Sequence, residues 1–173
     1  RVGMSIPLDE VWLEGSVFHG LVDSEELSGT DFQQMRFVGN LSDGATVALR
    51  VDSVTPGMGA LQDVWRYRVS YQEPTTGLWH PICTAADGTA VDAIPLEGRW
   101  DYSEGVAGGG AKLYDATTFT FACEGAALAK CVEFGYAPWR SVDGVSLAEH
   151  HQACTRLLRV EFCGDGTPQT ADR

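Results

Sequence analysis

Apolar and polar residues alternate along much of residues 43–123, the pattern of half-buried β-strands. In residues 47–52, Val, Leu and Val alternate with Ala, Arg and Asp; in residues 65–71, four large apolar residues alternate with Arg, Arg and Ser. Further runs lie at residues 78–83, 91–100 and 119–123, with turn signals at residues 43–44, 73–77 and 87–88. The pattern predicts antiparallel strands joined by short turns.

The period of the apolar positions becomes helical after Cys123. The first predicted helix has one apolar face and a stop at Gly135; the face holds Ala127, Leu128, Cys131 and Val132. The second begins at Ser146, whose spacing to Glu149 forms a capping box, and ends near Phe162. The fold class expected is α+β: an antiparallel β-rich N-terminal two-thirds followed by a disulfide-stapled helical pair.

Residues 1–42 show a separate pattern, in which an apolar residue is followed two places later by glycine, as in Leu13-Glu14-Gly15. Leu27, Phe32 and Phe37 fall five residues apart, which resembles a pentapeptide-repeat β-solenoid. Short strands and turns with glycine at strained positions are the favoured interpretation, and the solenoid stays open. We expect a segment 1–42 and an α+β domain 43–173 that together form one compact unit.

Composition and charge exclude several classes of protein. The chain has 173 residues and is 44% hydrophobic, which is sufficient for a core. Its formal net charge of −12 argues against a nucleic-acid partner, and with only two lysines it lacks a polybasic membrane patch. No apolar run is long enough for a transmembrane segment.

Five cysteines without CxxC pairs or zinc-finger spacing favour disulfides over a metal site, so no metal or organic cofactor is expected. Disulfides predict a secreted, cell-surface or periplasmic location. Buried free thiols in a cytosolic protein are the alternative. The chain opens at Arg1 without an initiator methionine, as expected for a processed or excerpted product.

The helix pattern also predicts the bridges. Cys131 and Cys154 lie on the apolar faces of successive helices, so we expect them to bond and to contribute about 3–4 kcal/mol. Cys123 precedes the first helix and Cys163 follows the second, which predicts a second bridge between them. Cys83 is then unpaired, with its partner in downstream sequence or in another chain.

The strongest catalytic candidate is His151, beside His150 and near Cys154. His151-x-x-Cys154 resembles the helix of secreted phospholipases A2, but Gln152 stands where that helix has Asp. A histidine packed on the apolar face of a helix is the favoured interpretation.

Weaker candidates come from two acidic residues and the aromatic side chains. Glu161 is spaced poorly for pairing with Arg156, and Asp165 lacks the DxDxDG spacing of a calcium loop, which favours a turn role. A glycan-binding platform is the alternative to core packing for Trp65, Tyr67, Tyr71, Trp79, Trp100 and Trp139.

Several short segments in one order resemble the ADYC domain. These are Phe121-Ala122-Cys123, Lys130-Cys131-Val132, Gly135-Tyr136-Ala137-Pro138-Trp139, His151-Gln152-Ala153-Cys154-Thr155-Arg156, Cys163-Gly164-Asp165-Gly166, Trp79-His80-Pro81-Ile82-Cys83 and Pro95-Leu96-Glu97-Gly98-Arg99-Trp100-Asp101. The name-giving tetrapeptide departs, because residues 160–163 read Val-Glu-Phe-Cys. The resemblance implies an exported or lipid-anchored protein of the kind found mainly in myxobacteria, with a further cysteine beyond the Cys163 turn.

Two functions are therefore expected. The first is an exported, disulfide-stabilised structural or binding domain with a protein or glycan partner. The alternative is a secreted hydrolase that uses His151 with a carboxylate from elsewhere in the chain.

Overall fold

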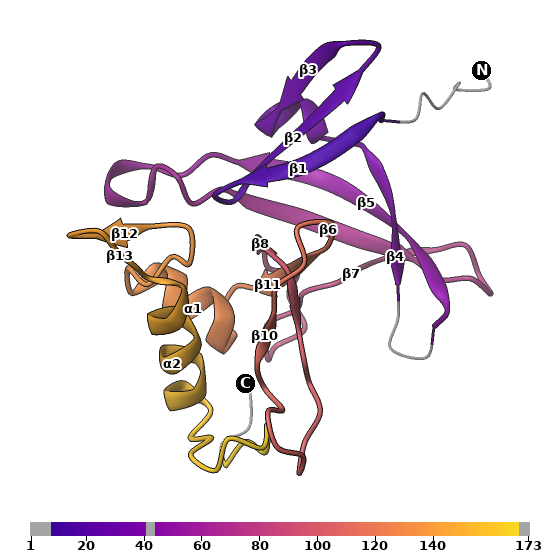
Figure 1. Ribbon diagram of the computed structural model, residues 1–173. Helices are drawn as coiled ribbons and strands as arrows, with labels where there is room; N and C mark the ends of the chain where they lie inside the picture. Colours follow the sequence, from indigo (N-terminus) through magenta and orange to yellow (C-terminus); the bar gives the residue numbers. More distant parts are fainter. Residues whose placement is uncertain (1–7, 41–43, 170–173) are drawn as a thin grey trace.

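A six-stranded sheet forms the centre of the molecule in the computed structural model, which describes residues 8–40 and 44–169 (Figure 1). Its strands, in spatial order, are β11 (Phe119–Cys123), β8 (Ala93–Glu97), β6 (Arg66–Gln72), β5 (Thr46–Thr55) and β4 (Arg36–Asn40), with β7 (Trp79–Pro81) paired to β6. All strand pairs are antiparallel. The predicted alternating runs therefore form the sheet.

The two longest strands show why the alternation matters. Val51 pairs with Val69, and both side chains face the same core. A β-bulge follows Val51, between Val51 and Ser53, and shifts the register of the pairing. The alternation thus buries one face of β5 and β6 and leaves arginines on the other.

Residues 8–40 form hairpins. β1 (Glu10–Glu14), β2 (Val17–Val22) and β3 (Glu25–Ser28) make a three-stranded antiparallel sheet, followed by the short 3₁₀ helix η1 (Gly29–Phe32). Residues 8–40 therefore consist of strands, turns and one short 3₁₀ helix, without five-residue coils. The expected boundary at 42/43 and Asp43 of the expected turn lie outside the described residues, but β4 pairs with β5 across them.

One core lies between the small and large sheets (Figure 1). Its fully buried side chains are Phe18, Phe32, Val51, Tyr67 and Val69. The backbone N–H of Phe18 donates to the hydroxyl of Tyr67 at 3.1 Å, so the hairpin is joined to β6 by a buried hydrogen bond. Complete burial of a side chain such as Phe18 contributes roughly 1.5–3 kcal/mol.

The second core lies where the helices cover β8 and β11. α1 (Ala127–Glu133) and α2 (Ala148–Leu158) are separated by a hairpin of β12 (Ser141–Val142) and β13 (Val145–Ser146). The core includes Ile94, Leu96, Trp100, Leu128 and Val132. Strands dominate the N-terminal part and helices follow, so the predicted α+β class is confirmed.

The second helix is shorter than expected at both ends. Ser146 belongs to β13, and its hydroxyl accepts a hydrogen bond from the backbone N–H of Ala148 at 3.2 Å. The helix ends at Leu158, because Val160 adopts a left-handed conformation with φ of 55° that no helix continues. The segment expected to be its last turn, up to Phe162, therefore leaves the helix axis.

Two disulfides are present, one of them as expected. Cys131 of α1 and Cys154 of α2 are bonded, with a Cα–Cα distance of 5.9 Å. The expected Cys123–Cys163 bridge and the unpaired Cys83 are wrong: Cys83 bonds to Cys123, and Cys163 is the exposed free thiol.

Strand pairing explains the different partner of Cys123. Cys123 pairs with Ala93 at the start of β8, and the carbonyl of Cys83 accepts a hydrogen bond from Val91 at 3.1 Å. Both cysteines thus flank the start of the same strand, at a Cα–Cα distance of 5.3 Å. The helix ends that were expected to bring Cys123 to Cys163 do not determine the pairing.

Within residues 8–40 and 44–169, no helix has the length and apolar character needed to cross a membrane.

Candidate functional site

His151 is completely buried between the helices and β9 (Arg99–Trp100). Its Nε2 lies 3.0 Å from the carbonyl oxygen of Leu128, and its ring meets the Trp100 ring edge-on at a centroid distance of 5.6 Å. A carbonyl only accepts, so Nε2 carries the proton of the neutral ring. Burial lowers the pKa of His151. These surroundings favour a packing role over proton transfer to a substrate.

The other catalytic candidates are placed apart from one another. His150 is exposed, and Cys154 is held in a disulfide. The Glu161 carboxylate is buried, 3.6 Å from the guanidinium Nε of Arg156. Asp165 accepts a hydrogen bond from the backbone N–H of Thr167 at 3.0 Å, the turn role expected for it. No hydrogen bond or ion pair joins any of them to His151 in the described part of the chain.

In residues 8–40 and 44–169, no three His, Cys, Asp or Glu side chains gather as metal ligands would.

A cleft of about 250 Å³ lies between the β1–β2 hairpin, the end of β8, the strand β10 (Lys112–Leu113) and the start of α2. Its lining residues come from five separate segments: Leu13, Gly15, Glu97, Lys112, Tyr114, Pro138, Trp139, Ser146 and Ala148. Aromatic, acidic, basic and hydroxyl side chains thus meet in one concave surface. We call it the Trp139 cleft.

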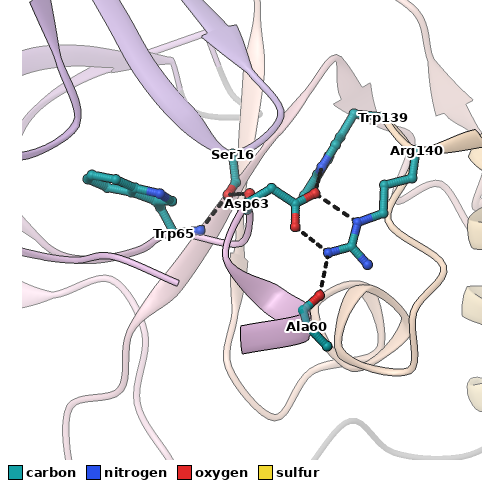
Figure 2. Close-up of polar contacts among 6 residues, drawn as sticks. All are labelled: Ser16, Ala60, Asp63, Trp65, Trp139 and Arg140. Carbon is teal, nitrogen blue, oxygen red and sulfur yellow. Dashed lines mark hydrogen bonds and ion pairs between the residues drawn. The ribbon is translucent and has the colours of Figure 1, made fainter. Parts of the chain in front are cut away.

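Two contacts hold the Trp139 ring in this cleft: a hydrogen bond from its indole N–H and close packing against Gly15. Its indole Nε1 donates to the carboxylate of Asp63 at 2.7 Å (Figure 2). Gly15, at φ 65°, lies against the ring: a Cβ there would be 3.1 Å from Nε1. A larger residue at position 15 would be strained by its backbone and would push against the indole.

Asp63 is the centre of the polar network shown in Figure 2. Arg140 binds its carboxylate with two nitrogens, Nε at 2.7 Å and a terminal nitrogen, and that terminal nitrogen also donates to the carbonyl of Ala60 at 2.9 Å. The hydrogen bonds from Arg140, and secondarily that from Trp139, outweigh burial and lower the pKa of Asp63 from 3.8 to about 2. Asp63 is therefore ionised and holds the aromatic wall of the cleft in place.

Buried Ser16, in the turn between β1 and β2, connects the network to the hairpin. Its hydroxyl donates to the carbonyl of Asp63 at 2.9 Å and accepts from the backbone N–H of Trp65 at 2.6 Å. The network thus joins the hairpin, the loop after η2 (Gly59–Leu61) and the turn after α1.

Glu97, Lys112 and Tyr114 also line the cleft. Gly98, at φ 89°, turns the chain out of β8, and a Cβ there would be 2.7 Å from the carbonyl of Leu113. This close approach brings Glu97 near Lys112. The ammonium of Lys112 lies 4.9 Å from the Tyr114 ring centroid. Burial lowers the pKa of Lys112.

Sequence reasoning named Trp139 as a glycan-platform residue but missed Asp63, Arg140, Lys112 and Tyr114 as its neighbours. Two segments that resemble the ADYC domain do meet here: the one containing Glu97 and the one containing Trp139. The sequence shows these segments only as separate motifs, and their meeting at one surface depends on the fold.

Fold and site together define a disulfide-stapled α+β domain with a mixed polar and aromatic cleft. The family model of the ADYC domain matches residues 29–173, most of the chain, and the chain belongs to this family. No curated protein and no solved structure matches it.

Proposed function

We propose that this chain is a binding domain that acts outside the cytoplasm and holds one sugar ring of a neutral glycan in the Trp139 cleft. The observation that carries the proposal is the pairing of Trp139 and Tyr114 with Glu97, Lys112 and Ser146 around one cleft. Aromatic rings pack against the apolar C–H face of a pyranose, while charged and hydroxyl groups bond to its hydroxyls.

The size and charge of the cleft limit the class of ligand that it can bind. Its volume of about 250 Å³ is below the 300–1,000 Å³ typical of sites for drug-sized ligands, which suits one ring of a longer chain. Glu97 and Lys112 offset each other in charge. The overall net charge of −12 repels acidic polysaccharides, so a neutral glycan is favoured.

The two disulfides support the location. Such bonds persist in oxidising compartments, and here they tie the segment after β7 to the end of β11 and α1 to α2. They also join elements that surround the second core. Protein isolated from its own source should contain both bridges, and five free thiols in that material would contradict the location.

The binding proposal is tested with an array of neutral and acidic polysaccharides, followed by calorimetry on the best ligand. Tyr114, 69% exposed, borders the cleft, whereas Tyr136, 41% exposed, lies outside it. Tyr114→Ala should weaken binding about tenfold, the effect of losing one stacked ring, and Tyr136→Ala should leave it unchanged. The proposal is wrong if wild type and Tyr114→Ala bind the ligand equally well, or if wild type binds no neutral glycan.

A further inference from the structure

A second, smaller cleft lies between β11 and the helices, separate from the Trp139 cleft. It has a volume of about 120 Å³, and its walls are largely apolar, with Trp100, Phe121, Ala126 and Leu128 among them. Arg159, immediately after α2, also lines it. We propose that this cleft binds a carboxylate carried on a short apolar chain, with Arg159 as the anion-binding group.

Arg159 is a buried cation that lacks a counterion in the described part of the chain. It is 9% exposed, and its Nε is buried without a hydrogen-bond partner. A terminal nitrogen donates to the carbonyl of Gly166 at 3.2 Å, but no described carboxylate oxygen lies within 4 Å of the guanidinium. A buried charge without a partner destabilises a fold by several kcal/mol, so binding an anion here is favourable.

The nearby carboxylate does not fill this role. Glu161 is buried 3.6 Å from Arg156 Nε and forms its ion pair with that residue. Asp165, in the turn that follows, accepts a hydrogen bond from the backbone N–H of Thr167 and forms no ion pair with Arg159 among the described residues. A buried arginine without an ion pair is unusual in a chain with 24 acidic and 12 basic residues.

The shape of the cleft limits the ligand. A cavity of about 150 Å³ lined by apolar side chains holds a benzene molecule, so about 120 Å³ accommodates about six non-hydrogen atoms. The guanidinium fork matches the two oxygens of a carboxylate. The hydroxyl of Thr155, also at the cleft, is already bonded to the carbonyl of His151 at 2.9 Å. Three carbons attached to a carboxylate, six non-hydrogen atoms in all, therefore fit, and butyrate represents this class.

The experiment titrates butyrate, and its neutral counterpart butyramide, into the intact oxidised protein by calorimetry. Arg159→Met removes the charge, and Arg99→Met removes an exposed arginine from the neighbouring strand β9 as a matched control. Ala126→Leu adds bulk to a lining residue of the cleft while keeping Arg159, so it tests the site even if Arg159→Met does not fold. Asp172→Asn distinguishes a free acid from the chain's own C-terminal acidic side chain.

Wild type should bind butyrate, and it should bind butyramide about tenfold more weakly or not at all. Arg159→Met and Ala126→Leu should each weaken butyrate binding about tenfold, whereas Arg99→Met should leave it unchanged. Unchanged butyrate binding in Asp172→Asn assigns the site to a free acid. Tighter binding in Asp172→Asn shows that the chain's own carboxylate competes for the same site. The proposal is overturned if butyrate does not bind wild type and Asp172→Asn, if butyramide binds equally well, or if Ala126→Leu leaves the affinity unchanged.

Discussion

The indole of Trp139 donates a hydrogen bond of 2.7 Å to Asp63, a residue 76 positions earlier in the chain. This bond joins the loop after η2 to the turn after α1, and it sets the orientation of the aromatic wall in the Trp139 cleft. The Arg140 ion pair requires a charged carboxylate, and the indole bond is stronger to a charged one, so the wall depends on the ionisation of one side chain.

Acidification should therefore destabilise the fold through Asp63. Its pKa in the folded state is about 2, lowered from 3.8, so this contribution is complete above about pH 4 and is lost as the pH falls towards 2. The side chain is 37% exposed and solvent screens the interaction, which reduces the expected contribution to about 1 kcal/mol. Asp63→Asn should lose this pH-dependent component in urea unfolding curves recorded between pH 2 and 6.

A suitable control is Asp143→Asn, in the exposed turn between β12 and β13. Asp143 has φ of 51°, a conformation that asparagine tolerates well, so the control should leave stability within about 0.5 kcal/mol of wild type. If Asp63→Asn and wild type show the same dependence on pH in this range, the role given to Asp63 is wrong.

More of the fold than of the Trp139 cleft could be predicted from the sequence. Alternation in residues 65–71 predicted β6, because a half-buried strand imposes a period of two on its own side chains. The hydrogen bond between Asp63 and Trp139 corresponds to no periodic pattern in the sequence, because it depends on how two distant loops pack. The Cys131–Cys154 bridge was predictable from two helix faces, whereas Cys83–Cys123 required the register of β8 against β11.

The bridge pattern predicts which thiol reacts. Cys83, Cys123, Cys131 and Cys154 are held in disulfides, whereas Cys163 is exposed. Alkylation of the unreduced protein, followed by peptide mass mapping, should modify Cys163 alone. Labelling after reduction and unfolding should modify all five cysteines and serves as the control for peptide coverage. Alkylation of Cys83 without reduction, or a disulfide-linked pair of peptides containing Cys123 and Cys163, would contradict the pairing.

The last prediction concerns His151, whose neutral ring is held in the core by the carbonyl of Leu128. Burial lowers its pKa below the ordinary 6.5, so the unfolded chain takes up a proton at a higher pH than the folded chain does. The neutral core position therefore contributes stability above pH 6.5, and this contribution is lost as the pH falls from 6.5 towards the lower pKa of the folded state.

His151→Leu should remove this dependence on pH. It should also destabilise the protein by about 1–3 kcal/mol at pH 7.5, because the carbonyl of Leu128 loses its donor in a buried place. The exposed neighbour offers a matched variant, His150→Gln, which should change stability by no more than about 0.5 kcal/mol. The direct measurement is an NMR titration of the His151 ring in folded protein and in urea. A folded-state pKa at or above 6.5 would show that the ring is open to solvent, and would return His151 to the list of possible proton donors and acceptors.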